Sequence, residues 1–195
     1  MSSVLVPLAQ GTEELEAVTI IDLLRRADIE VITAGLEVGP VTASRNTVLI
    51  PDTTLDQVLD KDFDMVVLPG GLPGATNLQR DSRILELLKN MAARGKYVAA
   101  ICAAPKVLAT AGLLQGKRAT CFPGSLNQQE ATGIEFQDEA VIVDGTIITS
   151  RGPGTAMDFS LQLIQLLQGE ETRNKVEQSL QRPKGHTTKP IKASA

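Results

Sequence analysis

One cysteine lies where a nucleophile is expected. Residues 97–101 are mostly apolar and predict a short buried strand, Cys102 follows them directly, and residues 106–111 contain good helix formers. Pro105 suits the first turn of that helix, because the N–H that proline lacks would have no partner there. This strand-to-helix corner resembles a nucleophile elbow, in which a sharp turn presents a side chain over the end of a parallel sheet. The free N–H groups and the positive end of the helix dipole would favour a thiolate, whereas the alternative interpretation is a buried structural cysteine.

A glycine-rich turn follows another short apolar strand, residues 65–68. Gly70 and Gly71 allow a close backbone approach and unusual backbone angles, which suit the presentation of N–H groups to an anion. An ordinary turn is the alternative. The turn lacks the Gly-Lys-Ser/Thr of a phosphate-binding loop, and its glycine spacing does not match a dinucleotide-binding fingerprint.

A narrow polar stripe runs along the apolar segment 13–27, which predicts a helix with Thr12 as its N-cap. The polar residues recur at helical spacing and are Glu16, Thr19, Asp22 and Arg26. Such a stripe is usually a solvated face, and its narrowness also favours a cleft or a subunit contact.

The elements that must position these residues alternate between strand and helix. The predicted strands are 3–8, 30–34, 65–68, 97–101, 118–121, 141–143 and 146–149, with a hairpin or a loop and strand over 41–50; the predicted helices are 13–27, 81–94, 106–111, 125–129, 156–167 (capped by Thr155) and 171–180, with a helical turn at 56–59. Short apolar strands between helices predict an α/β fold with a parallel sheet covered on both faces. Ligands bind beyond the carboxyl ends of such strands. The turn after Leu8, the Gly70–Gly71 turn and Cys102 all lie at carboxyl ends, so we expect one site there.

Composition fits a single domain, 1–182, followed by a basic tail, 183–195, that is expected to be mobile. The chain has 195 residues, a net charge of −4 and 3% aromatic residues without Trp, which argues against nucleic acid as a specific ligand. No apolar run reaches transmembrane length and no leader pattern opens the chain, so we expect a cytoplasmic protein with no membrane contact. Two cysteines, Cys102 and Cys121, and one histidine favour a reducing compartment and argue against a disulfide framework or a zinc site.

Five motifs stand in the order seen in the ThiJ/PfpI superfamily. They are GTEELE (11–16), SR (44–45), LPGG (68–71), AAICAAP (99–105) and TSRGPGTA (149–156). The chain resembles this superfamily over residues 4–180, and most closely the branch that contains the human Parkinson-disease protein and its bacterial relatives of the YajL type.

The resemblance implies a flavodoxin-like α/β sandwich with a mostly parallel sheet, a homodimer, and no cofactor or metal. It implies that Cys102 is the reactive nucleophile and that Glu16 is the carboxyl group beside its sulfur. Backbone N–H groups around the site would come from Gly70, Gly71 and Ala103. The residues that match the family's pocket are Arg45, Arg26, Phe122, Gly152 and Pro153, with Arg26 reaching across the dimer.

The resemblance implies three kinds of activity. They are the removal of methylglyoxal or glyoxal adducts from thiols, amines and guanidines, the cofactor-free conversion of glyoxals to hydroxy acids, and an oxidative-stress response with chaperone-like binding of client proteins. The chain also departs from some relatives, because Phe122 and Ala103 stand where these carry histidine, and the only histidine, His186, lies in the tail. A Cys–His pair is therefore not expected, and neither is glutamine amidotransfer or ordinary peptidase activity.

Two hypotheses for the function use the same residues. In the first, Cys102 attacks a glyoxal or its adduct, backbone N–H groups hold the oxyanion, and a protonated Glu16, which hydrogen-bonds the thiolate, moves the protons. In the second, Cys102 is a redox sensor whose sulfinate is hydrogen-bonded by Glu16 and alters the binding of partner proteins. Cys121 is expected to be a small packing residue, with a disulfide to Cys102 or to a partner as the alternative.

Overall fold

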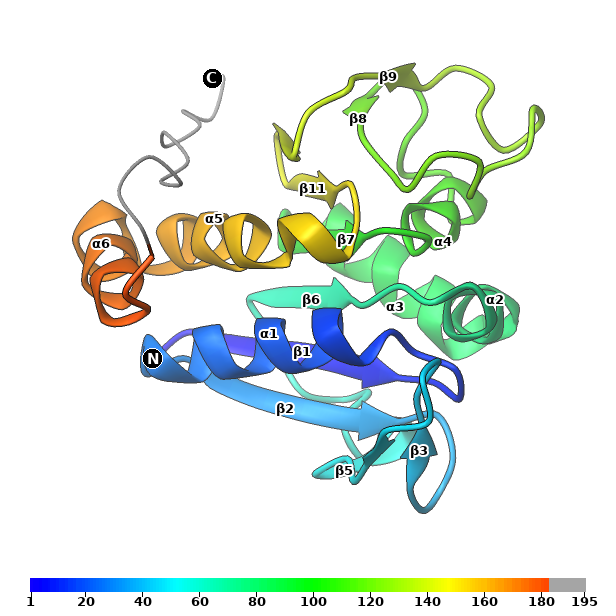
Figure 1. The fold of residues 1–195 in the computed structure, drawn as a ribbon. Coiled ribbons are helices and arrows are strands. Elements are labelled where there is room, and N and C mark those ends of the chain that lie inside the picture. Colours follow the sequence, from blue (N-terminus) through cyan, green and yellow to red (C-terminus); the bar gives the residue numbers. More distant parts are fainter. Residues whose placement is uncertain (183–195) are drawn as a thin grey trace.

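A central sheet forms from short strands that are apolar on both faces and must therefore be covered by helices. In the computed structural model, which describes residues 1–182, the order of the seven strands is β10-β11-β7-β6-β1-β2-β5, and within that part of the chain only β10 pairs antiparallel in this sheet (Figure 1). Its strands are β1 (Ser3–Leu8), β2 (Glu30–Gly35), β5 (Thr53–Thr54), β6 (Met65–Leu68), β7 (Tyr97–Ile101), β10 (Val141–Asp144) and β11 (Ile147–Ser150). Two small pairs lie outside it: β3 (Val41–Thr42) with β4 (Val48–Leu49), and β8 (Arg118–Ala119) with β9 (Glu135–Phe136). The predicted tail, 183–195, lies outside the described residues.

Helices cover both faces of the sheet. They are α1 (Glu14–Arg26), α2 (Leu72–Arg80), α3 (Ser82–Ala93), α4 (Pro105–Thr110), α5 (Ala156–Gln168) and α6 (Glu170–Ser179), with 3-10 turns at Leu55–Gln57 and Pro153–Thr155. On one face α1 packs against α5, which also contacts α6, and α2, α3 and α4 pack together on the other (Figure 1). The mostly parallel, flavodoxin-like fold is thus confirmed. None of the helices within residues 1–182 combines the length and apolar character that spanning a bilayer requires.

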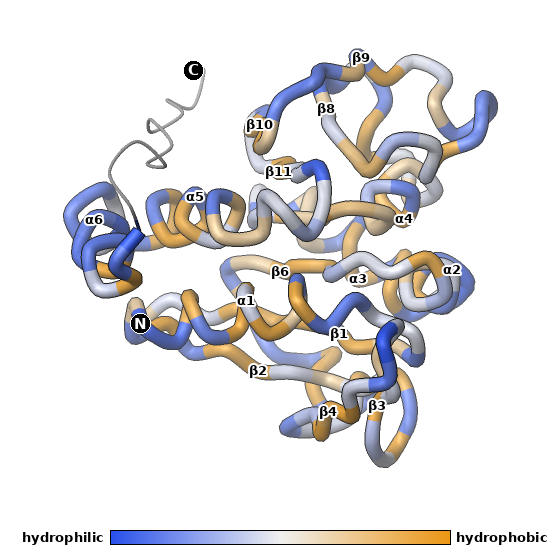
Figure 2. The backbone as a smooth tube through the Cα atoms, viewed as in Figure 1, coloured by the Kyte–Doolittle hydropathy of each residue, from blue (hydrophilic) through white to orange (hydrophobic). Residues whose placement is uncertain are grey.

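Two hydrophobic cores arise because successive side chains of a strand point to opposite faces. On β1, Val4 and Val6 belong to the core beneath α1 and α5, which contains Phe159, whereas Leu5 belongs to the core beneath α3 and α4, which contains Leu88. Burial of each such large side chain stabilises the fold by about 1.5–3 kcal/mol. Figure 2 shows hydrophobic residues concentrated along the strands and hydrophilic ones along α6. Both faces of the sheet are therefore anchored, which holds the carboxyl ends of its strands in place.

The segment after the glycine turn differs from the prediction. α2 occupies residues 72–80, for which no element was predicted, and it begins after Gly71 with Pro73 in its first turn. Gly74 lies inside this helix. The position requires a glycine because a Cβ there would stand 2.7 Å from Thr12 Cα. A glycine that close packing requires therefore obscured the helix in the sequence.

One predicted helix cap is wrong, and the other has the predicted position but no side-chain cap bond. The carboxylate of Glu13, not the Thr12 hydroxyl, accepts a hydrogen bond from Glu16 N (2.8 Å) and caps α1. Thr155 is the N-cap residue of α5, as predicted, but its side chain makes no cap bond; its hydroxyl accepts a hydrogen bond from Gly152 N (3.1 Å) instead.

The segment around 118–129 is more irregular than expected. The predicted strand shortens to β8, which pairs with β9 outside the main sheet, and 125–129 forms turns rather than a helix. The Asn127 side chain accepts from Gln129 N and Glu130 N, both at 2.9 Å. Such local side-chain bonds compete with helix formation.

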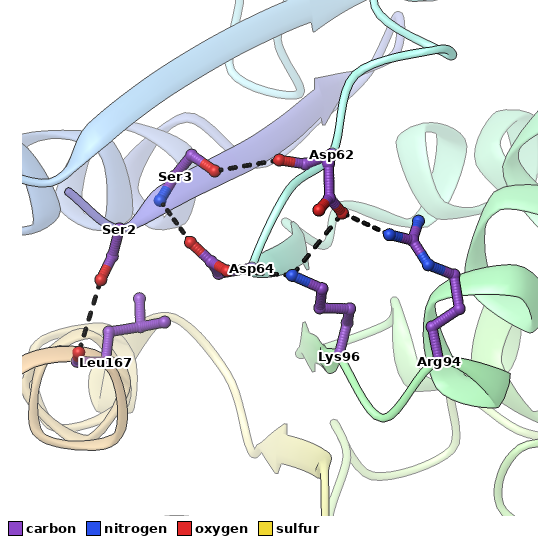
Figure 3. A network of polar contacts seen from close by, with 7 residues as sticks. All are labelled: Ser2, Ser3, Asp62, Asp64, Arg94, Lys96 and Leu167. Atoms are coloured by element: carbon purple, nitrogen blue, oxygen red, sulfur yellow. Dashed lines mark hydrogen bonds and ion pairs between the residues drawn. The ribbon is translucent and has the colours of Figure 1, made fainter.

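An ion-pair network joins the amino ends of β1, β6 and β7 (Figure 3). Ser3 N and Lys96 Nζ both donate to Asp64, at 3.0 Å each, and Arg94 pairs with Asp62 at 2.6 Å. These side chains are partly exposed, so each pair is worth about 0–1 kcal/mol. The network lies at the edge of the sheet opposite the carboxyl ends, and we interpret it as structural.

Candidate active site

Cys102 lies between β7 and α4, at the carboxyl edge of the sheet. Its φ of +63° is left-handed, which is unfavourable for cysteine. Its N–H donates to the Ser150 carbonyl (2.9 Å) and its own carbonyl accepts from Phe122 N (2.8 Å). Contacts on both sides therefore hold the strained turn, and this is the nucleophile elbow that the sequence predicts.

Glu16 reaches the elbow from α1 and is fully buried. Its Oε2 accepts a hydrogen bond from Gly70 N at 2.7 Å. Its other oxygen, Oε1, is buried and has no hydrogen-bond partner within residues 1–182, and the Cys102 thiol is close enough to the carboxyl group to affect its pKa. The structure thus brings the carboxyl group and the sulfur together from distant parts of the chain.

The glycine turn contacts both members of the pair. A Cβ on Gly70 would stand 2.7 Å from Cys102 Cβ and 2.7 Å from Glu16 Oε2, so no side chain fits there. Gly71 has a φ of +87°, and its N–H and that of Ala103 are directed at the sulfur. The expectation for Gly70 changes, because its N–H orients Glu16 and only the other two N–H groups face Cys102.

Burial is the main cause of the raised pKa of Glu16. Removal from water raises the pKa of its carboxyl group from 4.5 to about 7, against the hydrogen bonds from Gly70 and Cys102. The nearby charge of Glu13 adds to the increase. Glu16 therefore keeps a proton close to neutral pH, as an acid/base group requires.

The protonation state of Cys102 differs from the prediction, because the structure favours a thiol where the sequence predicts a thiolate. Burial and the negative charge of Glu16 raise the pKa of Cys102 to about 12, and the N–H groups of Gly71 and Ala103 act in the opposite direction. The part due to Glu16 vanishes when Glu16 is protonated, since a neutral carboxyl does not repel a thiolate. Thiolate formation is therefore coupled to proton uptake by Glu16, and the two groups titrate as a pair.

The remaining predicted pocket residues are not all at the sulfur. Gly152 lies against Phe122, where a Cβ would stand 3.3 Å from the ring, and Pro153 follows it in a 3-10 turn. Arg45 is exposed on the loop between β3 and β4. Arg26 is near the far end of α1, where it pairs with Asp22 at 2.6 Å.

Two residues near the site were not identified from the sequence. Glu14 accepts from Ser44 Oγ (3.0 Å) and Arg45 N (2.9 Å), which ties the β3–β4 loop to α1. Burial acts to raise the pKa of Glu14, but its hydrogen bonds with backbone N–H groups and with Ser44 lower that pKa to about 2. Ser150 anchors the elbow and shares a 2.7 Å hydrogen bond with the Thr155 hydroxyl. Both lie within the recognised motifs, but their hydrogen bonds depend on distant partners.

Few groups at the site suit a metal or a cofactor. Cys102 and Glu16 offer one thiol and one carboxyl group, whereas catalytic zinc sites use three protein ligands. Over residues 1–182, no group of three or more His, Cys, Asp or Glu side chains is placed to hold a metal ion.

The chain is similar to known proteins in both sequence and structure. A family model described as the DJ-1/PfpI family matches residues 2–166. Protein dj-1beta of Drosophila melanogaster is 44% identical over 179 residues, which cover 91% of this chain and 96% of that protein. The crystal structure of Drosophila melanogaster DJ-1beta has a TM-score of 0.88 and covers 92% of this chain and 98% of its own.

Two further relatives bear on the chemistry of the site. The glutathione-independent glyoxalase DJR-1.2 of Caenorhabditis elegans is 35% identical over 165 residues, which cover 85% of this chain and 88% of that protein. A structure of Toxoplasma gondii DJ-1, described as oxidized, is 38% identical with a TM-score of 0.86 and covers 92% of this chain and 98% of its own.

Proposed function

Because the chain belongs to the DJ-1/PfpI family, we propose that it is a cofactor-free enzyme in which Cys102 acts on methylglyoxal, glyoxal or their adducts with thiols and amines. The buried contact between Cys102 and Glu16 carries the proposal, because it joins a nucleophile to an acid/base group. The relative named as a glutathione-independent glyoxalase supports the substrate class.

The first step is addition to the aldehyde. With the proton on Glu16, the Cys102 thiolate attacks the aldehyde carbon, a C–S bond forms and the carbonyl electron pair moves to oxygen. The N–H groups of Gly71 and Ala103 donate to that oxygen as its charge develops. Glu16 then gives its proton to the oxygen, which leaves a hemithioacetal and a carboxylate.

The second step moves a hydrogen between the two carbons. The Glu16 carboxylate removes the proton from the sulfur-bearing carbon and passes it to the oxygen of the neighbouring carbonyl, which gives an enediol. The hydroxyl on the sulfur-bearing carbon then gives its proton to Glu16 and becomes a carbonyl, and Glu16 passes that proton to the neighbouring carbon. The product is a thioester of Cys102. Water attacks it, the Glu16 carboxylate takes up a proton from the water, the C–S bond breaks and the thiolate is restored, so that methylglyoxal and water give lactate and a proton.

Lactate formation from methylglyoxal without added thiol tests the proposal. We expect no turnover for Cys102→Ser, a decrease of about 10²–10⁴-fold for Glu16→Gln, and wild-type turnover for Cys121→Ser, the matched thiol control. Wild-type activity in Cys102→Ser would contradict the proposal.

A redox sensor is the second candidate, because Cys102 stands beside a protonated carboxyl group and two N–H groups that could hydrogen-bond a sulfinate. The structure of an oxidized relative favours it. Each of two peroxide molecules would transfer one oxygen to the sulfur and leave as water. Mass spectrometry after mild peroxide treatment should find two added oxygens on Cys102 and fewer in Glu16→Gln. Peptide maps without that mass gain would contradict a sensor role.

A further inference from the structure

A pocket lies beside the elbow, between the β8–β9 region and the loop after β11. Its volume is about 400 Å³, and its walls include Cys121, Thr120, Arg151, Leu126 and Phe136. Neither Cys102 nor Glu16 lines it. The pocket therefore places a second thiol apart from the proposed active site.

One of the residues that line this pocket carries a buried hydroxyl without a partner. Thr120 is 1% exposed and its N–H donates to Thr149 Oγ1 at 2.9 Å, but its own Oγ1 is buried and makes no hydrogen bond within residues 1–182. Buried polar groups are normally hydrogen-bonded. An acceptor oxygen of a bound molecule would satisfy this hydroxyl.

A cation lines the same pocket. The Arg151 side chain is 38% exposed and pairs with Asp138, which is another wall residue. A guanidinium carries five N–H donors, so this one pair leaves others for a ligand oxygen. The opposite charges cancel, which favours a neutral polar ligand over a strongly charged one.

The Cys121 thiol is half-buried and free. Burial raises the pKa of this thiol, although a hydrogen bond with the Ser125 hydroxyl and the charge of Arg151 act to lower it. A thiol that stays protonated reacts slowly with reagents in free solution. A reaction at Cys121 would therefore depend on prior binding in the pocket, where proximity replaces intrinsic reactivity.

We propose that this pocket binds a small α,β-unsaturated aldehyde or ketone and that Cys121 adds to it. Apolar walls hold the carbon skeleton, Thr120 and Arg151 donate to the carbonyl oxygen, and the sulfur bonds to the β-carbon. The C=C electron pair moves toward the carbonyl, and the thiol proton ends on the α-carbon. Atoms and electrons balance without a further reagent, and the inference does not depend on the proposed function.

The test uses cyclohex-2-en-1-one on the full chain carrying Cys102→Ser, which leaves one thiol. Peptide mapping should place the adduct on Cys121, and the rate should saturate with enone concentration. Cyclohexanone, which has the carbonyl but no C=C bond and therefore no electrophilic β-carbon, should slow labelling. In the same background, Thr120→Val should lower the labelling efficiency about 10-fold, while Thr120→Ser, which keeps the hydroxyl, should stay within about 3-fold.

Three outcomes would overturn the proposal. The first is a labelling rate that rises linearly with enone concentration and does not change when cyclohexanone is added. The second is equal labelling of the Cys102→Ser chain with and without Thr120→Val. The third is a Cys102→Ser chain that forms no adduct on Cys121. Methylglyoxal turnover by Cys121→Ser is measured separately, so failure here leaves the proposed function untouched.

Discussion

At the scale of the residue, one shared proton governs the Cys102–Glu16 pair. Each group is buried, and the negative charge of Glu16 raises the pKa of the thiol. Protonation of Glu16 is therefore what permits a thiolate at the elbow. The pair therefore forms a nucleophile only when Glu16 already holds the proton that it then gives to the developing oxyanion.

The first prediction concerns stability and pH. The pKa of Glu16 rises from 4.5 to about 7 on folding, so the native chain holds a proton that the unfolded chain releases. This contribution is fully present below pH 4.5 and is lost as pH rises through 7, by about 3 kcal/mol. Glu16→Gln lacks it, so the variant should gain stability relative to wild type between pH 4.5 and 8, as measured by urea unfolding. Parallel pH profiles for the two proteins would refute the assignment; exposed Glu86→Gln is the control.

The second prediction concerns the space at Gly70. Gly70→Ala places a methyl group 2.7 Å from both Cys102 Cβ and Glu16 Oε2, so the pair must separate. We expect a loss of about 1–3 kcal/mol in urea unfolding and a decrease in methylglyoxal turnover of more than about 10-fold. Gly154→Ala is the matched control, since a Cβ there meets nothing within 4 Å. Equal behaviour of the two variants would show that the close contact is unimportant.

At the scale of the element, α1 holds the β3–β4 hairpin through one carboxylate. Glu14 accepts from Ser44 and from two backbone N–H groups, those of Arg45 and Thr47. The hairpin itself is short, so this contact sets where Arg45 lies.

Glu14→Ala should therefore loosen the hairpin. Hydrogen bonds to a charged group contribute about 1.5–3 kcal/mol, so exchange of the Arg45 amide should be about 10-fold faster or more. Hydrogen exchange with mass spectrometry checks this, with exposed Glu86→Ala as the control. An unchanged exchange rate at Arg45 would contradict the role of Glu14.

At the scale of the whole molecule, one face carries apolar side chains that the chain itself leaves open. Leu15 and Val18 on α1 are 51% and 47% exposed, and Met157 on the adjacent α5 is 43% exposed. We propose that this face is the homodimer contact, with Arg26 of the same helix reaching toward the partner. Exposed apolar side chains gathered on one face mark protein–protein contacts.

Val18→Asp places a charge in that contact and should shift the chain from dimer to monomer in sedimentation velocity. Leu72→Asp, on α2 and also exposed (62%), is the control and should leave the mass unchanged. A wild-type monomer, or a dimer in both variants, would contradict the proposed face.

Local patterns were enough to predict most of the fold. Strands at 3–8, 65–68 and 97–101 and the elbow at Cys102 follow from apolar runs and from Pro105, and the structure confirms them. The helix over residues 72–80 was missed, because Gly74 serves packing against Thr12 rather than a turn. The periodicity of apolar residues cannot distinguish a glycine that allows close packing from a glycine that allows a turn of the backbone.

The sequence by itself determined the α/β order, the elbow and, through its motifs, the family. Only the tertiary structure decided that Gly70 N–H orients Glu16, that burial sets the protonation of the pair, and that Cys121 faces a pocket with an unbonded hydroxyl. Apolar runs and turn residues act over a few neighbours, so they can be recognised in the sequence. Hydrogen-bond partners, burial and pKa values arise between distant segments, and they exist only once the sheet has brought those segments together.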